Sequence, residues 1–181
     1  PSASAHSFYQ QSLAVREAVF GRDRFVTALT LNNLAGLYVE AASYDRAEAL
    51  YREALGVLEG SLGPDHPHTA AVMGNLAMLY QTLGVFDRAE ALHRRALGVR
   101  ERVLGPDHPD VAVSLNNLAE LYRAKGSFHR AGPLYRRALA IREEGLGAEH
   151  PGTAVVLNNL AELYRQMGDH EQARPLYERA L

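Results

Sequence analysis

The feature that most constrains the fold of this chain is an internal repeat. The motif LGPDHP at residues 62–67 returns at residues 104–109 and, as LGAEHP, at residues 146–151, so successive copies begin 42 residues apart. Residues 104–139 and 146–181 are identical at 23 of 36 aligned positions. A fixed period of this length predicts an array of stacked units and not a single globular core.

Each unit contains two apolar patterns with helical spacing. In the first pattern, apolar residues stand at i, i+3, i+4 and i+7, which is one face of a helix. The four copies of this pattern start at Leu31, Met73, Leu115 and Leu157, and each ends in a tyrosine. The second pattern starts at Ala47, Ala89, Ala131 and Ala173. Every unit is therefore expected to be a pair of packed helices, which buries its apolar stripes only by stacking on its neighbours.

The turn between the two helices carries its own signal. Glycine stands there at Gly84, Gly126 and Gly168, where a helix commonly ends in a left-handed residue. The first unit has Ala42 at this place, which predicts a turn that is slightly strained or differently shaped.

Two prolines lie about five residues into the second helices of the last two units, at Pro133 and Pro175. A proline there removes a backbone hydrogen bond, so we expect a kink or a late helix start.

Composition excludes several classes of protein. The net charge is −2 over 181 residues, which gives no basic face for nucleic acid. Cysteine is absent, so no disulfide framework or thiolate metal site is expected. No apolar run approaches the ~20 residues that span a bilayer, and we expect a cytoplasmic protein with no membrane partner. The chain begins at Pro1 with no signal-like stretch, so a fragment of a longer protein is expected.

The repeated motif, Leu-Ala-x-Leu-Tyr, then Gly, then Ala-x-x-Leu-Tyr-x-x-Ala-Leu, resembles the tetratricopeptide repeat (TPR). The spacing of the copies, the LGPDHP linker and the LNNLA segment are similar to the kinesin light chain-like class of these repeats. The sequence is rich in Ala, Arg and Gly, which favours a bacterial protein. The resemblance implies an all-α fold, a right-handed superhelical solenoid of antiparallel helix pairs.

The predicted organisation is a single array over residues 1–181. It opens with a partial repeat at residues 1–21, which holds only a second helix. Four repeats follow, at residues 22–63, 64–105, 106–147 and 148–181, and the second helix of the last repeat is truncated.

The resemblance also assigns a binding surface. In this family the first helix of each pair lines the concave groove, and the asparagine before the Leu-Ala pair typically contacts the backbone of a bound peptide. We call the matching positions the first asparagine series: Asn33, Asn75, Asn117 and Asn159. The residues that precede them form the second asparagine series, Asn32, Asn116 and Asn158, with Gly74 in the remaining unit. An amide both donates and accepts, which suits a peptide backbone.

A structural interpretation of these amides stays open. An inward asparagine can satisfy a carbonyl of a loop or of a neighbouring helix, and buried polar groups are usually paired in this way. We favour groove lining for the first asparagine series and structural pairing for the second.

Charged residues one turn further along are candidates for selecting the ligand. Glu120 and Glu162 lie three residues beyond the first asparagine series, and Arg123 and Arg165 lie six beyond. The alternative is that each glutamate only pairs with the arginine three residues later on its own helix.

No enzyme or cofactor is expected. The linker histidines His66, His108 and His150 recur with the period, and His68 lies beside the first of them. This recurrence does not suggest converging metal ligands. No Gly-x-Ser-x-Gly elbow or phosphate-binding glycine loop occurs.

The leading function is therefore a protein–protein interaction module that binds an extended peptide or partner segment in the groove. One alternative is a scaffold that self-associates through uncapped ends. Another is an intramolecular regulatory array for an ATPase, kinase or caspase-like protease domain elsewhere in a parent chain.

Overall fold

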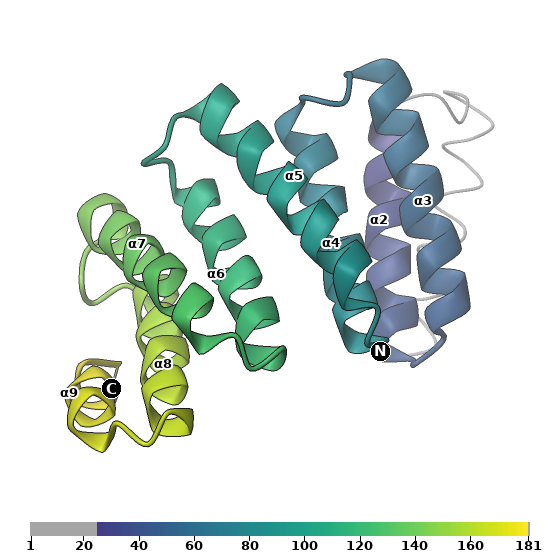
Figure 1. Ribbon diagram of the computed structural model, residues 1–181. Helices are drawn as coiled ribbons and strands as arrows, with labels where there is room; N and C mark the ends of the chain where they lie inside the picture. The colour runs from purple at the N-terminus through teal and green to yellow at the C-terminus, as the bar shows by residue number, and fades with distance from the viewer. Residues whose placement is uncertain (1–24, 181) are drawn as a thin grey trace. The chain divides into compact units, whose positions relative to one another are not determined.

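A computed structural model describes residues 25–180 of the chain, and every element in that range is an α-helix (Figure 1). The half repeat predicted for residues 1–21 and the last residue, Leu181, lie outside the described residues. The helices are α2 (Phe25–Glu40), α3 (Tyr44–Ser61), α4 (Pro67–Thr82), α5 (Phe86–Leu104), α6 (Pro109–Ala124), α7 (Phe128–Leu146), α8 (Pro151–Gln166) and α9 (His170–Ala180). The predicted all-α class of paired TPR-like helices is confirmed.

The described helices fall into two compact units, residues 25–99 and residues 100–180, with the boundary inside α5. In the first unit α2 packs on α3, and α3 packs on α4. In the second unit α6 packs on α7, α7 on α8, and α8 on α9. Within these units a helix contacts its pair mate, and the second helices α3 and α7 also contact the first helix of the next pair.

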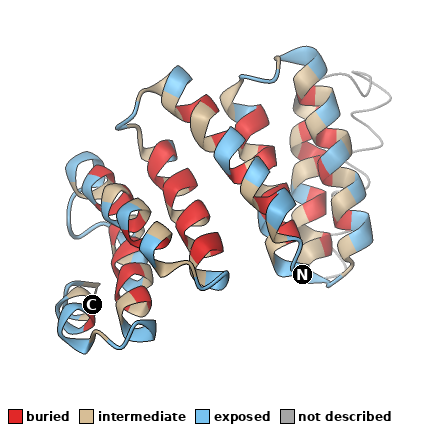
Figure 2. Ribbon diagram, viewed as in Figure 1, coloured by how far each residue is buried: buried red, intermediate tan, exposed pale blue. Residues whose placement is uncertain are grey.

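Small residues sit at the contacts between helices. The alanines that open the second pattern, Ala47, Ala89, Ala131 and Ala173, are at most 3% exposed. Between α4 and α5, Ala70 and Met73 pack against Ala96 and Val99. Buried positions recur along every helix in this way (Figure 2), because small residues beside large ones let helices interdigitate.

The linker histidines cap the first helices. Pro67, Pro109 and Pro151 are the first residues of α4, α6 and α8, where a proline loses no helical hydrogen bond. The preceding histidine accepts a hydrogen bond at Nδ1 from the backbone N–H two residues later, at 3.2 Å for His66, 3.1 Å for His108 and 2.9 Å for His150. The recurrence of histidine in the linker therefore has a local structural cause.

The turn inside each pair has the predicted left-handed residue. At the end of α2, the N–H of Ser43 donates to the carbonyl of Tyr38 at 2.8 Å, which closes a Schellman motif around Ala42. The same bond recurs at the ends of α4, α6 and α8 around a glycine with φ between 70° and 79°. Ala42 has φ 52°, so the expected strain at this turn is present.

The two helix prolines do not delay their helices. α7 begins at Phe128 and contains Pro133, and α9 begins at His170 and contains Pro175. These starts match that of α5 at Phe86, so a late start is wrong. Packing of the alanine face holds the first turn in place although the proline removes one bond.

Consecutive second helices are joined by ion pairs that repeat with the period. Glu59 of α3 pairs with Arg95 of α5 at 2.9 Å, and Glu101 of α5 pairs with Arg137 of α7 at 2.5 Å. Glu143 of α7 pairs in the same way with Arg179 of α9.

Candidate functional site

The first asparagine series lies on the first helices, at one position in each pair. Asn33 of α2 is exposed, whereas Asn75 of α4, Asn117 of α6 and Asn159 of α8 are half-buried. The four helices begin 42 residues apart, at residues 25, 67, 109 and 151, so each amide stands at the ninth position of its helix.

Amides of the two asparagine series bond to each other across helices. In the first unit, Asn75 Nδ2 donates to Asn32 Oδ1 at 2.8 Å, which joins α4 to α2. In the second unit, Asn159 Nδ2 donates to Asn116 Oδ1 at 2.9 Å, which joins α8 to α6. Structural pairing, favoured for the second series alone, therefore also involves two members of the first series.

These bonds leave part of each amide available. An asparagine amide has two donor hydrogens and two acceptor lone pairs. In the pair of Asn116 and Asn159, one hydrogen and one lone pair are used, and both side chains remain half-buried instead of fully enclosed. The bond fixes the orientation of both amides, so the remaining donor and acceptor have defined directions.

Gly74 of α4 interrupts the second asparagine series. A Cβ built on Gly74 would meet nothing within 4 Å, so no steric clash requires glycine there. Asn32 and Asn116 each supply an amide acceptor to an asparagine of the next repeat, and Gly74 has no side chain to do so.

The candidate glutamates pair on their own helices. Glu120 and Arg123 of α6 approach to 3.6 Å. On α8 the pair is tighter, because Arg165 donates to both oxygens of Glu162 at 2.7 Å and 2.6 Å. Each glutamate therefore pairs with the arginine three residues later on its own helix, which is the alternative that the sequence left open.

Glu162 is held by more than its arginine. Gln166 donates to the same carboxylate at 2.9 Å, and the hydroxyl of Tyr177 on α9 donates to it at 3.1 Å. The bonds from Arg165, followed by those from Gln166 and Tyr177, outweigh desolvation and lower the pKa of Glu162 to about 2. Four hydrogen bonds fill the carboxylate, so Glu162 positions Arg165 and has little capacity left for a ligand.

Arginine–tyrosine contacts are a feature that the sequence interpretation missed. The guanidinium of Arg46 lies 5.6 Å from the ring centre of Tyr38, and that of Arg88 lies 5.7 Å from Tyr80. In the second unit Arg130 lies 4.0 Å from the ring of Tyr122 and also donates to its hydroxyl. The sequence signal for these contacts is an arginine eight residues after the tyrosine, which occurs in three of the four repeats. Such cation–π contacts join the two helices of a pair.

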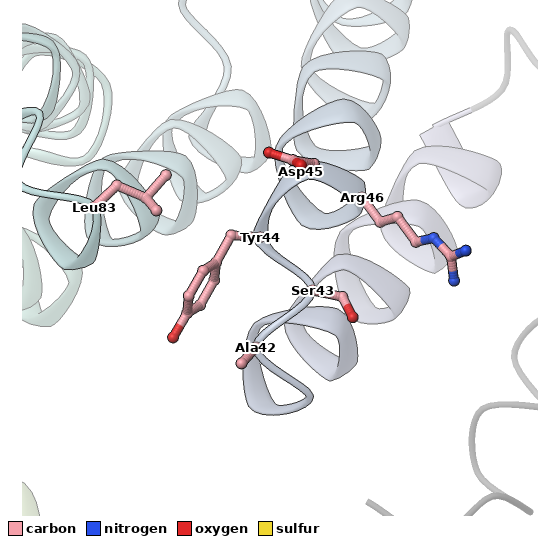
Figure 3. A pocket seen from close by; sticks show the side chains of 6 residues that line it. All are labelled: Ala42, Ser43, Tyr44, Asp45, Arg46 and Leu83. Carbon is pink, nitrogen blue, oxygen red and sulfur yellow. The ribbon is translucent and has the colours of Figure 1, made fainter.

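Two hollows border the turns between helices. The larger, of about 550 Å³, is lined by Ala42, Ser43, Tyr44, Asp45, Arg46 and Leu83. Figure 3 shows the ring of Tyr44 extending on the side of Leu83, whereas Arg46 points away from it. The other, of about 370 Å³, is lined by Arg165, His170, Ala173, Arg174, Tyr177 and Glu178. Of the predicted site residues, Arg165 alone lines either hollow.

Residues 25–180 contain neither a cluster of metal ligands nor a helix that could span a membrane. No group of three or more metal-binding side chains converges in this range. None of the described helices is long and apolar enough to cross a membrane.

Comparison with known proteins agrees with this geometry. A family model described as tetratricopeptide repeat matches residues 3–60, 42–101, 69–144 and 110–181. The crystal structure of BtubC (BKLC) from P. vanneervenii is similar at 29% identity with a TM-score of 0.83, over 98% of this chain and 70% of that chain. No curated protein matches the chain.

Two crystal structures of a Podosopora anserina putative kinesin light chain with nearly identical TPR-like repeats are also similar. Both are 24% identical, with TM-scores of 0.79 and 0.76, over 98% of this chain and 84% of those chains. Proteins built from such repeats generally mediate protein–protein interaction. The repeat period, the paired helices and the family match lead to one conclusion: this chain belongs to the tetratricopeptide repeat family.

Proposed function

We propose that the first helices of this array bind an extended peptide segment of a partner protein through the first asparagine series. The proposal assigns no catalytic step to the array and keeps the cytoplasmic setting expected from the sequence. Arg165, positioned by Glu162, and the pair of Glu120 and Arg123 would contact the side chains of the peptide, and the amides would contact its backbone.

The observation that carries the proposal is the pair of amide–amide bonds between neighbouring first helices. Asn159 and Asn116 orient each other at 2.9 Å and stay half-buried. A peptide backbone presents one donor and one acceptor per residue, and the oriented amides offer a complementary acceptor and donor. Because the contacts go to backbone, they hold many sequences, as an adaptor requires.

The charged candidates contribute mainly through arginine. Glu162 is filled by Arg165, Gln166 and Tyr177, whereas the Arg165 side chain is 55% exposed. Arg165 retains N–H groups that are not directed at Glu162, since a guanidinium carries five donors.

The test compares two substitutions that break the same hydrogen bond. Asn159→Ala removes the bond to Asn116 and also the proposed peptide contact. Asn116→Ala removes only the bond, and leaves the amide of Asn159 in place. Both variants should lose about 1 kcal/mol of unfolding free energy, the typical net value of one hydrogen bond.

Peptide binding should separate the two variants. The probe is an array of random peptides of about twelve residues, which extend to roughly 40 Å. Asn159→Ala should lose most wild-type hits. Asn116→Ala leaves the amide of Asn159 present but less firmly oriented, so it should retain these hits with weaker binding. Equal losses in both variants would assign the amides to structure alone. A folded wild-type protein with no hits at all would contradict the proposed function.

A further inference from the structure

The first helix pair has an open site where the last pair has a glutamate. Four residues of α2 and α3 occupy the repeat positions of Glu162 and its partners. They are Gly36, Val39, Glu40 and Tyr51, which stand where Glu162, Arg165, Gln166 and Tyr177 stand. In the last pair, Glu162 accepts a hydrogen bond from the hydroxyl of Tyr177 at 3.1 Å. Gly36 has no side chain to accept the equivalent bond.

The hydroxyl of Tyr51 on α3 points to this open site. It lies 3.8 Å from the position that a Cβ on Gly36 would take, and, chain neighbours aside, no other side chain of residues 25–180 lies within 4 Å of that position. Tyr51 is only 5% exposed, and its hydroxyl has no hydrogen-bond partner within the same range. Burial raises the pKa of Tyr51, so the hydroxyl stays protonated as a donor. Because nearly all buried polar groups are paired, this donor indicates a contact that these residues do not supply.

The position of Gly36 is accessible in other repeats as well. At the equivalent position, Met78 of α4 is 51% exposed and the side chain of Glu120 on α6 is 35% exposed. In the sequence both helices have other repeats before and after them, so this position stays accessible inside the array. Gly36 also lies three residues, nearly one helical turn, after Asn33 of the first asparagine series.

The residues beside the open site decide what can bind there. Val39 replaces Arg165, which donates to Glu162 at 2.6 Å, so a carboxylate would lack this cation in the first pair. Gln166 donates to Glu162 at 2.9 Å, which shows that a side chain four residues along the helix reaches the site. In α2 that residue is Glu40, an acceptor that repels a carboxylate and attracts an N–H group.

We infer that this open site binds the carboxamide side chain of a glutamine or asparagine in a bound peptide, an inference that rests on the proposed function. The carbonyl oxygen of the carboxamide accepts from the hydroxyl of Tyr51, and its N–H donates to Glu40. A carboxamide supplies this acceptor and this donor on one planar group. The peptide backbone contacts Asn33, and the carboxamide enters the space that the side chain of Glu162 fills in α8.

The geometry can be tested without a peptide by placing the carboxamide on the chain itself. Gly36→Gln supplies it, and Gly36→Ala is the matched control, because alanine has the higher helix propensity but no amide. Gly36→Gln should have the higher urea midpoint of the two. The advantage should shrink in the Tyr51→Phe background, since a double-mutant cycle isolates the bond to the hydroxyl.

The two tyrosines should differ in what their hydroxyls contribute to folding. Tyr51→Phe alone should leave the urea midpoint unchanged, because its hydroxyl has no partner to lose. Tyr177→Phe removes the bond to Glu162 and should lower the midpoint.

Peptides provide the second test, with the same random array as the probe. Wild-type hits should be enriched in glutamine or asparagine at one position. Resynthesised with the corresponding acid there, these peptides should bind the wild-type chain at least tenfold more weakly. The amide peptides should bind Tyr51→Phe several-fold more weakly than they bind the wild type.

Glu40→Gln tests the discrimination between amide and acid. It replaces the repelling acceptor by a donor, so the glutamine and glutamate peptides should bind this variant with similar affinity. Glu144→Gln, which removes the same charge at an exposed position of α7, is the matched control and should keep the preference for the amide.

Three results would overturn the inference. Equal urea midpoints for Gly36→Gln and Gly36→Ala would show that the site does not hold a carboxamide. Hits that tolerate the acid and bind Tyr51→Phe as tightly as the wild type would overturn the preference, and would leave peptide binding by the asparagines standing. An array without hits would contradict the proposed function and the inference together.

Discussion

At the residue scale, one substitution within the repeat changes the chemistry of the core. His93 stands where other repeats have Tyr51 and Tyr135, and it is only 1% exposed. Burial lowers its pKa to about 4 from an ordinary 6.5. The imidazole is therefore neutral in the folded protein at pH values where the unfolded chain would already be protonated.

This shift predicts an acid-sensitive stability. The unfolded chain gains a proton near pH 6.5 and the folded chain only near pH 4, so unfolding free energy should fall as the pH drops between these values. The full loss from this residue is about 3 kcal/mol, from the width of the shift. Urea unfolding at several pH values measures it.

The control for this prediction is His93→Tyr, which restores the residue used in the equivalent positions. The variant should lose less stability between pH 6.5 and pH 4 than the wild type does. Parallel pH profiles for the two proteins would show that His93 is not the source.

At the element scale, the starts of the first helices depend on a side chain that is rarely considered a cap. His108 accepts at 3.1 Å from the N–H of Asp110, and one of the otherwise unsatisfied N–H groups of α6 is thereby bonded. The bond is local, two residues along the chain, and it recurs at α4 and α8.

His108→Ala should therefore cost about 1 kcal/mol of unfolding free energy, the usual value of a lost N-terminal cap. His108→Asn should recover most of it, because its amide oxygen can accept the same bond. Chemical denaturation compares these variants with His129→Ala, an exposed position inside α7. A cost at His108 no larger than at His129 would contradict the capping role.

At the scale of the whole molecule, the ion pairs between second helices follow the period through both units. Glu59–Arg95 lies in the first unit, and Glu101–Arg137 and Glu143–Arg179 lie in the second. Each side chain is partly exposed, so each pair contributes little alone, about 0.2–1 kcal/mol. Their repetition makes the sum measurable.

Replacing Glu59, Glu101 and Glu143 together by glutamine should lower the unfolding free energy by roughly 1–2 kcal/mol in dilute buffer. The difference from the wild type should shrink in 1 M salt, where the screening length falls to about 3 Å. Urea unfolding at both salt concentrations is the measurement. A loss that is independent of salt would point to packing and not to charge.

The helix pairs and their turns could be predicted from sequence because their causes are local. Apolar spacing, Pro109 at a helix start and Gly126 at a helix end act within one or two turns of chain. The strain at Ala42 was predicted for the same reason. For Pro133 the late helix start was wrong, since packing of α7 on its neighbours decides whether the first turn forms, and the alternative of a kink stays a prediction.

Candidate site residues could be located by the period, but their partners could not. The sequence alone places Asn116 and Asn159 in successive repeats on equivalent helices. It leaves open whether they contact a ligand or a carbonyl of a loop or neighbouring helix, and it does not indicate that they bond to each other. Only the tertiary structure brings their amides to 2.9 Å across 43 residues. It likewise decides that Tyr177 reaches Glu162 and that His93 loses its water, because hydrogen bonding and desolvation depend on which atoms become neighbours in space.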